Sequence, residues 1–323
     1  MTGLEQAIRS QPAALERLAT RALPDRATRL LDRERIWLVG TGSSQHAAEL
    51  GAAMLARAGR DARAAASMSF VLGGAGERIR AGDGVIVISH TGESAFPRAA
   101  HAASLEAGAE TLSITGEGAG WPDAIETVAR EPSETYTVSY LGTLAVLALL
   151  AHSAGAEELG PEGLARAAEA VQAVIDAPDL ERLPDPERLI VLAGVGPGQV
   201  TAREGALKLR EAARLLAEGF DAEYLFHGSA VPLSSRDALV LVQSSHDPHG
   251  VLREVGRAAE GEGVAVAALD EPGLDDPLLA QLPLTARLQL LALERAIRGG
   301  HDPDKVITGA WEAGPLWDVG APG

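Results

Sequence analysis

The sequence predicts an α/β fold made of two successive units, each with a parallel sheet between layers of helices. Three observations predict it. Short apolar runs alternate with helical patterns, which is typical of strand–helix–strand units whose strands are parallel. The alternation restarts at RLIVLAGVGPG (188–198), which repeats the earlier RIWLVGTGSS (35–44) and indicates a weak internal duplication. The length of 323 residues accommodates about two domains.

In the first unit, each expected strand is an apolar run that stops at glycine or polar residues. The run Val85–Ile88 before Ser89 is the clearest case, because a strand buried on both faces of a parallel sheet is apolar throughout. Strands are expected at 35–40, 84–89 and 109–115, an edge strand at 124–130, and helices at 44–58, 94–107 and 139–153. The longest apolar stretch, 138–151, is too short to span a bilayer and predicts a buried helix.

The second unit follows a polar, proline-rich stretch, 155–186, which itself predicts a helix at 164–175. Its run DALVLVQSS (237–245) corresponds to DGVIVISHT (83–91) of the first unit. A strand and glycine turn at 188–198, a helix at 199–217, strands at 237–245 and 263–270, and a last helix at 282–298 complete the expected order.

Composition excludes several classes of function. The chain has no cysteine, which excludes disulfides, thiolate metal sites and a cysteine nucleophile. Its formal net charge of −17 argues against a nucleic-acid or anionic-membrane surface, because phosphate backbones are bound by excess lysine and arginine. The N-terminal residues are charged and lack the apolar core of a signal peptide. We therefore expect a cytoplasmic protein without a nucleic-acid or membrane partner.

Two loops rich in glycine and hydroxyl groups follow the first two expected strands. They are GTGSSQHA (40–47) and SHTGES (89–94). Both are expected at the carboxyl edge of the sheet, where hydroxyls and helix N–H groups hold a phosphate without cationic side chains. A single loop of this kind is more often ordinary helix capping, but two at equivalent strand ends favour a phosphate site. Neither fits a dinucleotide fingerprint or a nucleotide-triphosphate loop.

The second half carries three charged residues on one face of a helix. Glu204, Lys208 and Glu211 are spaced i, i+4 and i+7. A solvated salt-bridge stripe explains this spacing, but lysine occurs only twice in the chain. A proton-transfer or imine role requires lysine, because arginine stays protonated. Downstream, His227 precedes a glycine turn, and an acid/base role and simple packing are equally open for it.

These motifs resemble the sugar isomerase (SIS) domain family. SHTGES resembles the family's phosphosugar loop SxSGxT. EGALKLREAARLLAEGFDAEYLFHG (204–228) resembles the catalytic segment in the isomerase half of the aminosugar-phosphate synthases of that family. The resemblance covers nearly the whole chain and implies two tandem SIS domains, 1–160 and 161–323. Each would be a three-layer αβα unit with a five-stranded parallel sheet.

The resemblance implies phosphate-binding roles for a group of residues in the first domain. Ser44, Ser89, Thr91 and Ser94 match the family's phosphate-binding hydroxyls. His90 stands where the family commonly has glutamine, and its backbone N–H is expected to serve the phosphate.

Catalytic roles follow from the same resemblance. Glu211 matches the carboxylate that moves a proton between C1 and C2, and Lys208 matches a lysine that assists at the sugar oxygens. His227 matches the histidine that opens the sugar ring, which the neighbouring subunit contributes in the family, so a homodimer is implied. Lys305 either matches the tail lysine that forms an imine with the ketose or is a surface lysine in an unrelated tail. No cofactor is implied.

The second-half loop QSSHDPHG (243–250) lacks the phosphate signature, so we expect one phosphosugar site per chain, in the first domain. Three residues of this loop, His246, Asp247 and His249, are explained better by solvation than by a metal site. We therefore expect no metal.

Two departures from the family bear on function. The chain starts directly at the SIS region and has no cysteine, so no glutamine hydrolysis is expected from it. The segment ETYTVSYLGTL (134–144) differs from the family form, so substrate contacts there have changed. We expect an enzyme that isomerises a 6-phosphosugar, or that deaminates or aminates an aminosugar phosphate with free ammonia. The alternative is a non-catalytic phosphosugar sensor.

Overall fold

The computed structural model describes residues 1–73, 79–122, 124–243, 246–271 and 273–320. The chain forms two compact units, each assembled from separate stretches. The first-sheet unit comprises 10–132, 138–165 and 307–323, and the second-sheet unit comprises 1–9, 133–137 and 166–306. The division into domains at residue 160 stays a prediction.

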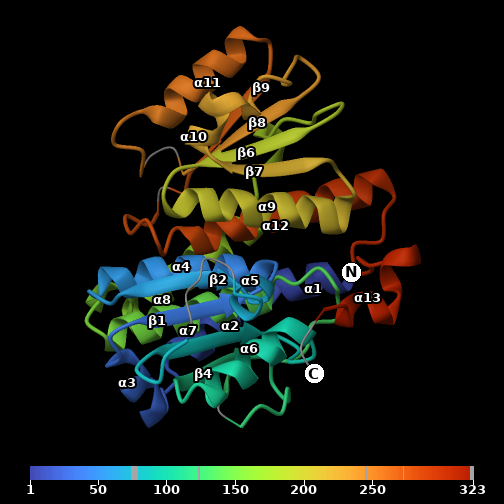
Figure 1. The fold of residues 1–323 in the computed structure, drawn as a ribbon. Coiled ribbons are helices and arrows are strands. Elements are labelled where there is room, and N and C mark those ends of the chain that lie inside the picture. The colour runs from blue at the N-terminus through green and yellow to red at the C-terminus, as the bar shows by residue number, and fades with distance from the viewer. Residues whose placement is uncertain (74–78, 123, 244–245, 272, 321–323) are drawn as a thin grey trace. The chain divides into compact units, whose positions relative to one another are not determined.

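The first-sheet unit contains a five-stranded parallel sheet in the order β2-β1-β3-β4-β5, as expected (Figure 1). Its strands are β1 (Ile36–Gly40), β2 (Ala62–Ala66), β3 (Gly84–Ser89), β4 (Glu110–Thr115) and β5 (Ala124–Glu126). Every residue of the central strand β3 is buried, which is why its sequence is a continuous apolar run. The sheet is parallel throughout, so all the strands end at one edge.

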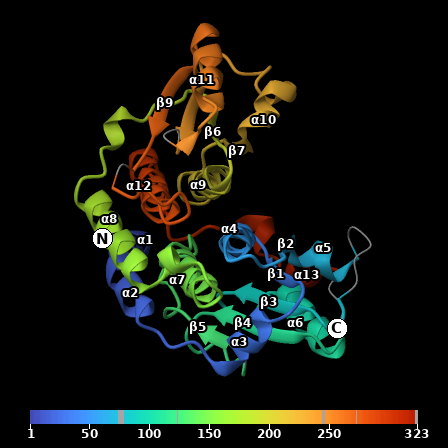
Figure 2. The ribbon, with the colours of Figure 1, turned by 90° about the vertical axis from the view of Figure 1, so that its left-hand side faces the viewer.

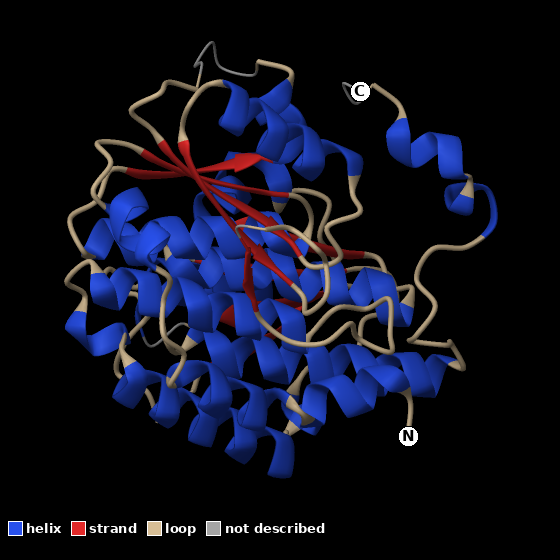
Figure 3. Ribbon diagram, turned by 90° about the horizontal axis from the view of Figure 1, so that it is seen from below, coloured by secondary structure: helices blue, strands red, loops and turns tan. Residues whose placement is uncertain are grey.

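Helices cover both faces of this sheet. The helical elements of the unit are α2 (Gln11–Ala19), α3 (Asp25–Leu31), α4 (Ser43–Arg57), α5 (Ser67–Val71), α6 (Ala95–Glu106), α7 (Val138–Ser153), η2 (Glu157–Leu159), η6 (Gly309–Glu312) and α13 (Gly314–Asp318). On one face Gly51 of α4 lies close to Leu38 and to Leu147 of α7. On the other, Val87 packs with Ala100 of α6. Figure 3 shows the strands of the chain, in red, lying among helices.

The helix α7 is the buried helix that the long apolar stretch predicts. Its residues from Val138 to Ala151 are all buried, mainly against α4 and α2. Among the described residues, no helix has both the length and the apolar character needed to cross a membrane.

The second-sheet unit repeats the strand order of the first. Its parallel sheet runs β7-β6-β8-β9, which corresponds to β2-β1-β3-β4. The strands are β6 (Ile190–Gly194), β7 (Ala217–Asp221), β8 (Ala238–Val242) and β9 (Ala265–Leu269). Five strands were expected here, but the described part of the chain has four in this sheet.

The helices of the second-sheet unit also form two layers. They are α1 (Gly3–Arg9), η3 (Leu180–Arg182), α9 (Pro197–Ala213), α10 (Ala222–Tyr224), the irregular turn η4 (Leu225–Ser229), α11 (Val251–Gly261) and α12 (Gln281–Gly299); α8 (Pro161–Asp176) contributes to both units. The helices α9 and α12 lie side by side on one face of the sheet, while α10 and α11 cover the other (Figures 1 and 2). Gly205 of α9 lies against Leu192 and Leu288, so α9 is held tightly between the sheet and α12.

The same strand–turn–helix junction begins the sheet in both units. Gly42 has φ 57° and ψ −131°, and Gly196 has φ 51° and ψ −126°, values that side-chain-bearing residues rarely adopt. A Cβ at Gly40 would lie 2.5 Å from the backbone of Ser44, and one at Gly194 would lie 2.3 Å from the backbone of α9. Glycine is therefore required at both positions, which explains why GTG and GVG recur 154 residues apart.

Candidate active site

The two expected phosphate loops lie at the carboxyl edge of the first sheet. Ser89 is the last residue of β3 and is 5% exposed, and Ser44 is the second residue of α4, directly after β1. Since β1 and β3 are paired neighbours, the structure brings these two hydroxyl residues to adjacent strand ends. The free N–H groups of α4 and α6 begin at this same edge.

The loop after β3 is shaped by a glycine with positive φ. Gly92 is buried with φ 69°, and a Cβ there would lie 2.8 Å from the indole nitrogen of Trp121. The Thr91 hydroxyl accepts a hydrogen bond of 3.2 Å from the backbone N–H of Glu93, which tightens the turn. Ser94 then occupies the N-cap position of α6 and is exposed.

Ordinary helix capping does not account for these hydroxyls. In the described structure the Ser94 side chain makes no capping hydrogen bond to α6. The N-cap of α4 is Gly42, which has no side chain, and Ser44 lies inside the helix. A capping serine is recognised by a bond from its oxygen to an N–H of the first turn, so both hydroxyl positions remain open to a ligand.

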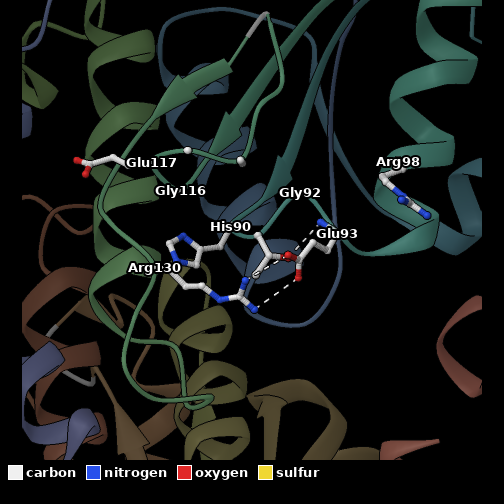
Figure 4. Close-up of a pocket in the computed structure, with 10 residues that line it drawn as sticks. His90, Gly92, Glu93, Arg98, Gly116, Glu117 and Arg130 are labelled. Carbon is white, nitrogen blue, oxygen red and sulfur yellow. Dashed lines mark hydrogen bonds and ion pairs between the residues drawn. The ribbon is translucent and has the colours of Figure 1, made fainter. Parts of the chain in front are cut away.

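A cavity of about 240 Å³ lies beside this loop (Figure 4). It is lined by His90, Thr91, Gly92, Glu93, Arg98, Gly116, Glu117, Gly118, Ala119 and Arg130. Two arginines, Arg98 and Arg130, stand in the cavity wall. A phosphate cradle without cationic side chains stays a prediction. Arg130 follows β5, so only the pairing of β5 with β4 brings it here, and no local sequence signal identifies it.

His90 is held as a neutral imidazole next to the cavity. Burial, with a further contribution from the positive charge of Arg130, lowers the pKa of His90 to about 4. A Cβ at Gly116 would lie 2.6 Å from the ring, so the histidine fits only because glycine stands opposite. The Gly116 N–H donates a 2.8 Å hydrogen bond to the His90 carbonyl, which fixes the loop against the end of β4.

The charged face of α9 is buried, so the solvated-stripe interpretation is wrong. The side chain of Glu204 is 0% exposed, that of Lys208 1% and that of Glu211 20%. Lys208 Nζ lies 2.5 Å from Glu211 Oε2 and 3.5 Å from Glu204 Oε1. One ammonium group therefore lies between two carboxylates inside the protein.

Burial also changes the acidity of Glu211. The pKa of Glu211 is raised, mainly because burial disfavours the charged form of the carboxyl group. The neighbouring Glu204 adds to the rise, and the Lys208 ammonium opposes it. A carboxylate with a raised pKa is a stronger base than an exposed one, and the adjacent ammonium can stabilise negative charge that develops on a substrate oxygen. This arrangement suits proton transfer at carbon next to a carbonyl.

His227 is not a packed core residue. It lies in η4, where Gly228 with φ 109° interrupts the helical path, and its side chain is 74% exposed. Its Nε2 lies 3.8 Å from Oε1 of Glu223, on the preceding turn. The structure thus places this imidazole at the surface of the second-sheet unit and pairs it with Glu223, not with the carboxylates of α9.

Lys305 is tied into the second-sheet unit by backbone and side chain. Its Nζ lies 3.2 Å from Oε1 of Glu134, and it is 50% exposed. Arg214, which follows the last residue of α9, donates a 2.7 Å hydrogen bond to the Lys305 carbonyl. Lys305 therefore lies near the end of α9 that carries Glu211, but an attack by its nitrogen on a carbonyl would require the pair with Glu134 to open.

The equivalent strand end of the second sheet is occupied by side chains. Gln243 follows β8 with φ 61°, and Gln281 Nε2 donates a 2.5 Å hydrogen bond to its Oε1. Gln243 Nε2 in turn donates to the carbonyl of Pro277 over 3.0 Å. Side-chain amides thus occupy the position after β8, whereas the hydroxyl loop follows the corresponding strand β3 of the first sheet. Residues 244 and 245 of this loop lie outside the described residues.

The His246–His249 loop shows no arrangement suited to a metal. Asp247 accepts hydrogen bonds from the N–H groups of His249 and Leu252, at 3.3 and 2.6 Å, which connects the loop to the start of α11. His246 Nε2 lies 3.0 Å from the carbonyl oxygen of Asp275. Within the described ranges, no group of three or more His, Asp or Glu side chains is placed to hold a metal ion.

Comparison with known proteins gives the class to which this architecture corresponds. Residues 29–153 match the SIS domain family. Glutamine–fructose-6-phosphate aminotransferase (isomerizing) of Bacillus spizizenii is 29% identical over 87% of this chain and 51% of its own length. The enzyme of the same name from Gloeobacter violaceus is 27% identical over 85% of this chain and 51% of its own length. The chain thus spans about half the length of these curated relatives.

Solved structures show the same fold over nearly the whole chain. Tagatose-6-phosphate ketose/aldose isomerase from Escherichia coli has a TM-score of 0.81 at 22% identity and covers 96% of this chain and 98% of its own. Glucosamine-6-phosphate deaminase from Thermotoga maritima has a TM-score of 0.76 at 20% identity and covers 94% of this chain and 97% of its own. The C-terminal domain of glucosamine-fructose-6-phosphate aminotransferase from Francisella tularensis has a TM-score of 0.74 at 18% identity and covers 94% of this chain and 98% of its own.

Residues 29–153 thus match the SIS domain family, and the two parallel sheets flanked by helices form the same α/β fold as these solved structures. More particularly, the curated relatives that it resembles over about half of their length are glutamine–fructose-6-phosphate aminotransferases.

Proposed function

We propose that this protein is a sugar-phosphate enzyme that catalyses enolisation. It acts either as an aldose–ketose isomerase of a 6-phosphosugar or on an aminosugar phosphate, which it deaminates with release of ammonia or forms by amination with free ammonia. In this proposal Glu211 moves a proton between C1 and C2, and Lys208 stabilises charge at the sugar oxygens. Ser44, Ser89, Thr91, Ser94 and the backbone N–H of His90 hold the phosphate.

One observation carries the proposal: on a helix fixed between a sheet and α12, Glu204 and Lys208 are buried and the Glu211 side chain is only 20% exposed. Burying ionisable groups costs several kcal/mol per ion, at roughly the scale of a domain's whole stability, and well-packed apolar residues would serve the fold at least as well. Such an arrangement is expected where the charges perform chemistry. It includes a carboxylate whose pKa is raised, which is the property that a base for a carbon acid needs.

The phosphate part of the proposal is supported by the hydroxyl loops and by the relatives. The Ser94 hydroxyl is not used for capping, and cationic side chains line the adjoining cavity. Two of the solved structures that share the fold over 94% or more of this chain are named for action on tagatose 6-phosphate and glucosamine 6-phosphate. A phosphate anchored at one end of the sugar would restrict the motion of the rest of the molecule.

The ring-opening role of His227 forms a further part of the proposal and requires a homodimer. An imidazole that is 74% exposed on its own chain is free to enter the site of a second copy. We also propose that the second-sheet unit is a second SIS domain, because it repeats the strand order and the glycine junction of the first.

A non-catalytic phosphosugar sensor is the second candidate. If the enzymatic reaction requires a lysine that forms an imine, the ion pair between Lys305 and Glu134 favours the sensor, because the Lys305 nitrogen is held by the carboxylate. Isomerisation and its enolisation step need no imine, so the buried α9 cluster still favours an enzyme.

Solvent exchange separates the two candidates. The protein is incubated in deuterated water with fructose 6-phosphate, glucose 6-phosphate, glucosamine 6-phosphate and their galacto and tagatose counterparts, and NMR follows deuterium at C1 and C2. An enzyme introduces deuterium into one of these sugars and thereby identifies its substrate class. Binding of a phosphosugar without any exchange would instead establish the sensor.

A further inference from the structure

An ion pair bridges the cavity beside the proposed phosphate loop. Arg130 Nη1 lies 3.2 Å from Glu93 Oε1, and Nη2 lies 3.5 Å from Oε2 (Figure 4). Glu93 belongs to the loop itself, between Thr91 and Ser94, whereas Arg130 reaches it from the segment after β5. A guanidinium group is thereby held at the loop by a carboxylate of the loop.

This ion pair is easily exchanged. The side chains of Arg130 and Glu93 are 65% and 66% exposed, and neither is anchored by a second side chain. Water competes strongly with an exposed pair of this kind, so its net stability is small. A phosphate dianion carries twice the charge of a carboxylate and offers three acceptor oxygens, and a guanidinium fork binds it in a bidentate manner.

The other charged groups of the cavity do not compete for this role. Figure 4 shows Glu117 pointing away from the pair, and its Oε1 lies 3.4 Å from Arg17 Nη1 instead. Arg98 stands apart on α6 in the same view. The charge of Arg130 also acts at the loop, since it contributes to the lowered pKa of His90.

We propose that Arg130 is a specificity-determining residue that recognises the dianionic phosphate, and that Glu93 holds it in place until the phosphate displaces the carboxylate. This inference rests on the proposed phosphate site. The Glu93 carboxylate then competes with the phosphate for the Arg130 guanidinium, so its effect on phosphate binding requires Arg130. A sugar without a phosphate would not displace Glu93 and would gain nothing from the guanidinium.

A double-mutant cycle tests the inference by isothermal titration with fructose 6-phosphate and with inorganic phosphate. The variants are E93Q, R130Q and the double variant E93Q/R130Q, all at exposed positions that leave the fold intact, as a melting curve verifies. R130Q is expected to weaken binding about tenfold, and E93Q to tighten it about three- to tenfold, because the competitor is removed. In the R130Q background E93Q should have no further effect.

The control is R63Q, which removes a partly exposed arginine of β2 that is likewise paired with a carboxylate, that of Asp61. It should bind both ligands as the wild type does. If E93Q tightens binding equally with and without Arg130, Glu93 acts by simple charge repulsion and the inference is wrong. If R130Q binds as the wild type does, the inference alone fails. If the wild type binds neither ligand, the proposed phosphate site fails and the inference with it.

Discussion

Lys208 and Glu211 form an ion pair inside the second-sheet unit: Nζ lies 2.5 Å from Oε2, and the lysine side chain is 1% exposed. The second carboxylate, that of Glu204, is 3.5 Å from the same nitrogen and fully buried. Glu204 could not stay charged at this depth without the ammonium. The lysine therefore links the stability of α9 to the acidity of the proposed base.

Replacing Lys208 by methionine should destabilise the protein strongly. Removing one partner of a buried pair leaves an uncompensated charge, and we expect a loss of about 3–5 kcal/mol in the free energy of unfolding. The matched control is K305M, which changes the chain's other lysine. Because Lys305 is half-exposed, that variant should lose at most about 1 kcal/mol. Chemical denaturation measures both, and equal losses would show that Lys208 is not a buried charge.

Ser94→Ala should separate phosphate binding from helix capping. Because the hydroxyl makes no capping bond, the variant should lose no more than about 0.5 kcal/mol of stability, whereas removing a true serine cap costs about 1 kcal/mol. Combined with Ser44→Ala, it should weaken binding of a 6-phosphosugar. Denaturation and titration calorimetry measure the two effects. A capping-sized loss of stability with unchanged binding would contradict the phosphate role.

The stability of the protein should fall as pH is lowered between about 6.5 and 4. The pKa of His90 is about 4 in the folded protein, against 6.5 for an ordinary histidine. Between these two pH values His90 is protonated in the unfolded chain but neutral in the folded chain. The free energy of unfolding therefore rises with pH through this window, and above about pH 6.5 protonation of His90 no longer lowers it. His90→Gln should flatten this part of the profile measured by denaturation. An identical profile in the variant would show that the ring is not held neutral.

The proposed homodimer with a shared site predicts complementation between subunits. His227→Ala and Glu211→Gln should each abolish activity when both chains carry the same substitution. If each site combines His227 of one chain with Glu211 of the other, subunit exchange between the two variants restores one intact site per mixed dimer. About a quarter of the wild-type activity should then return in an equimolar mixture, for statistical reasons. Activity assays after subunit exchange measure this, and no recovery would place both residues in the same chain's site.

The sequence predicts the central parts of the fold well because they are buried on both sides. The apolar run of β3 and the all-apolar α7 identify a strand and a helix directly. The strands β2 (ARAAA) and β7 (AEGFD) are missed. Each pairs with one neighbour at the edge of its sheet and is partly exposed, so neither needs an apolar run.

The candidate site is predicted unevenly for a similar reason. A spacing of i, i+4 and i+7 places Glu204, Lys208 and Glu211 on one face of a helix, but it does not determine whether that face is exposed to solvent or buried. Only the packing of α9 against α12 and the sheet decides this. Local sequence motifs do not identify Arg130, because it lies 37 residues after Glu93 in the sequence and meets it only in the folded sheet.

The most direct test of the central claim is solvent exchange by Glu211→Gln. Deuterium incorporation at C1 or C2 of the reactive 6-phosphosugar is compared in the wild type, in this variant and in Glu260→Gln, an exposed carboxylate on α11 that serves as the control. We predict that Glu211→Gln loses exchange by about a thousandfold or more while it still binds the sugar, and that the control exchanges like the wild type. Exchange at the wild-type rate in Glu211→Gln would contradict the assignment of Glu211 as the base.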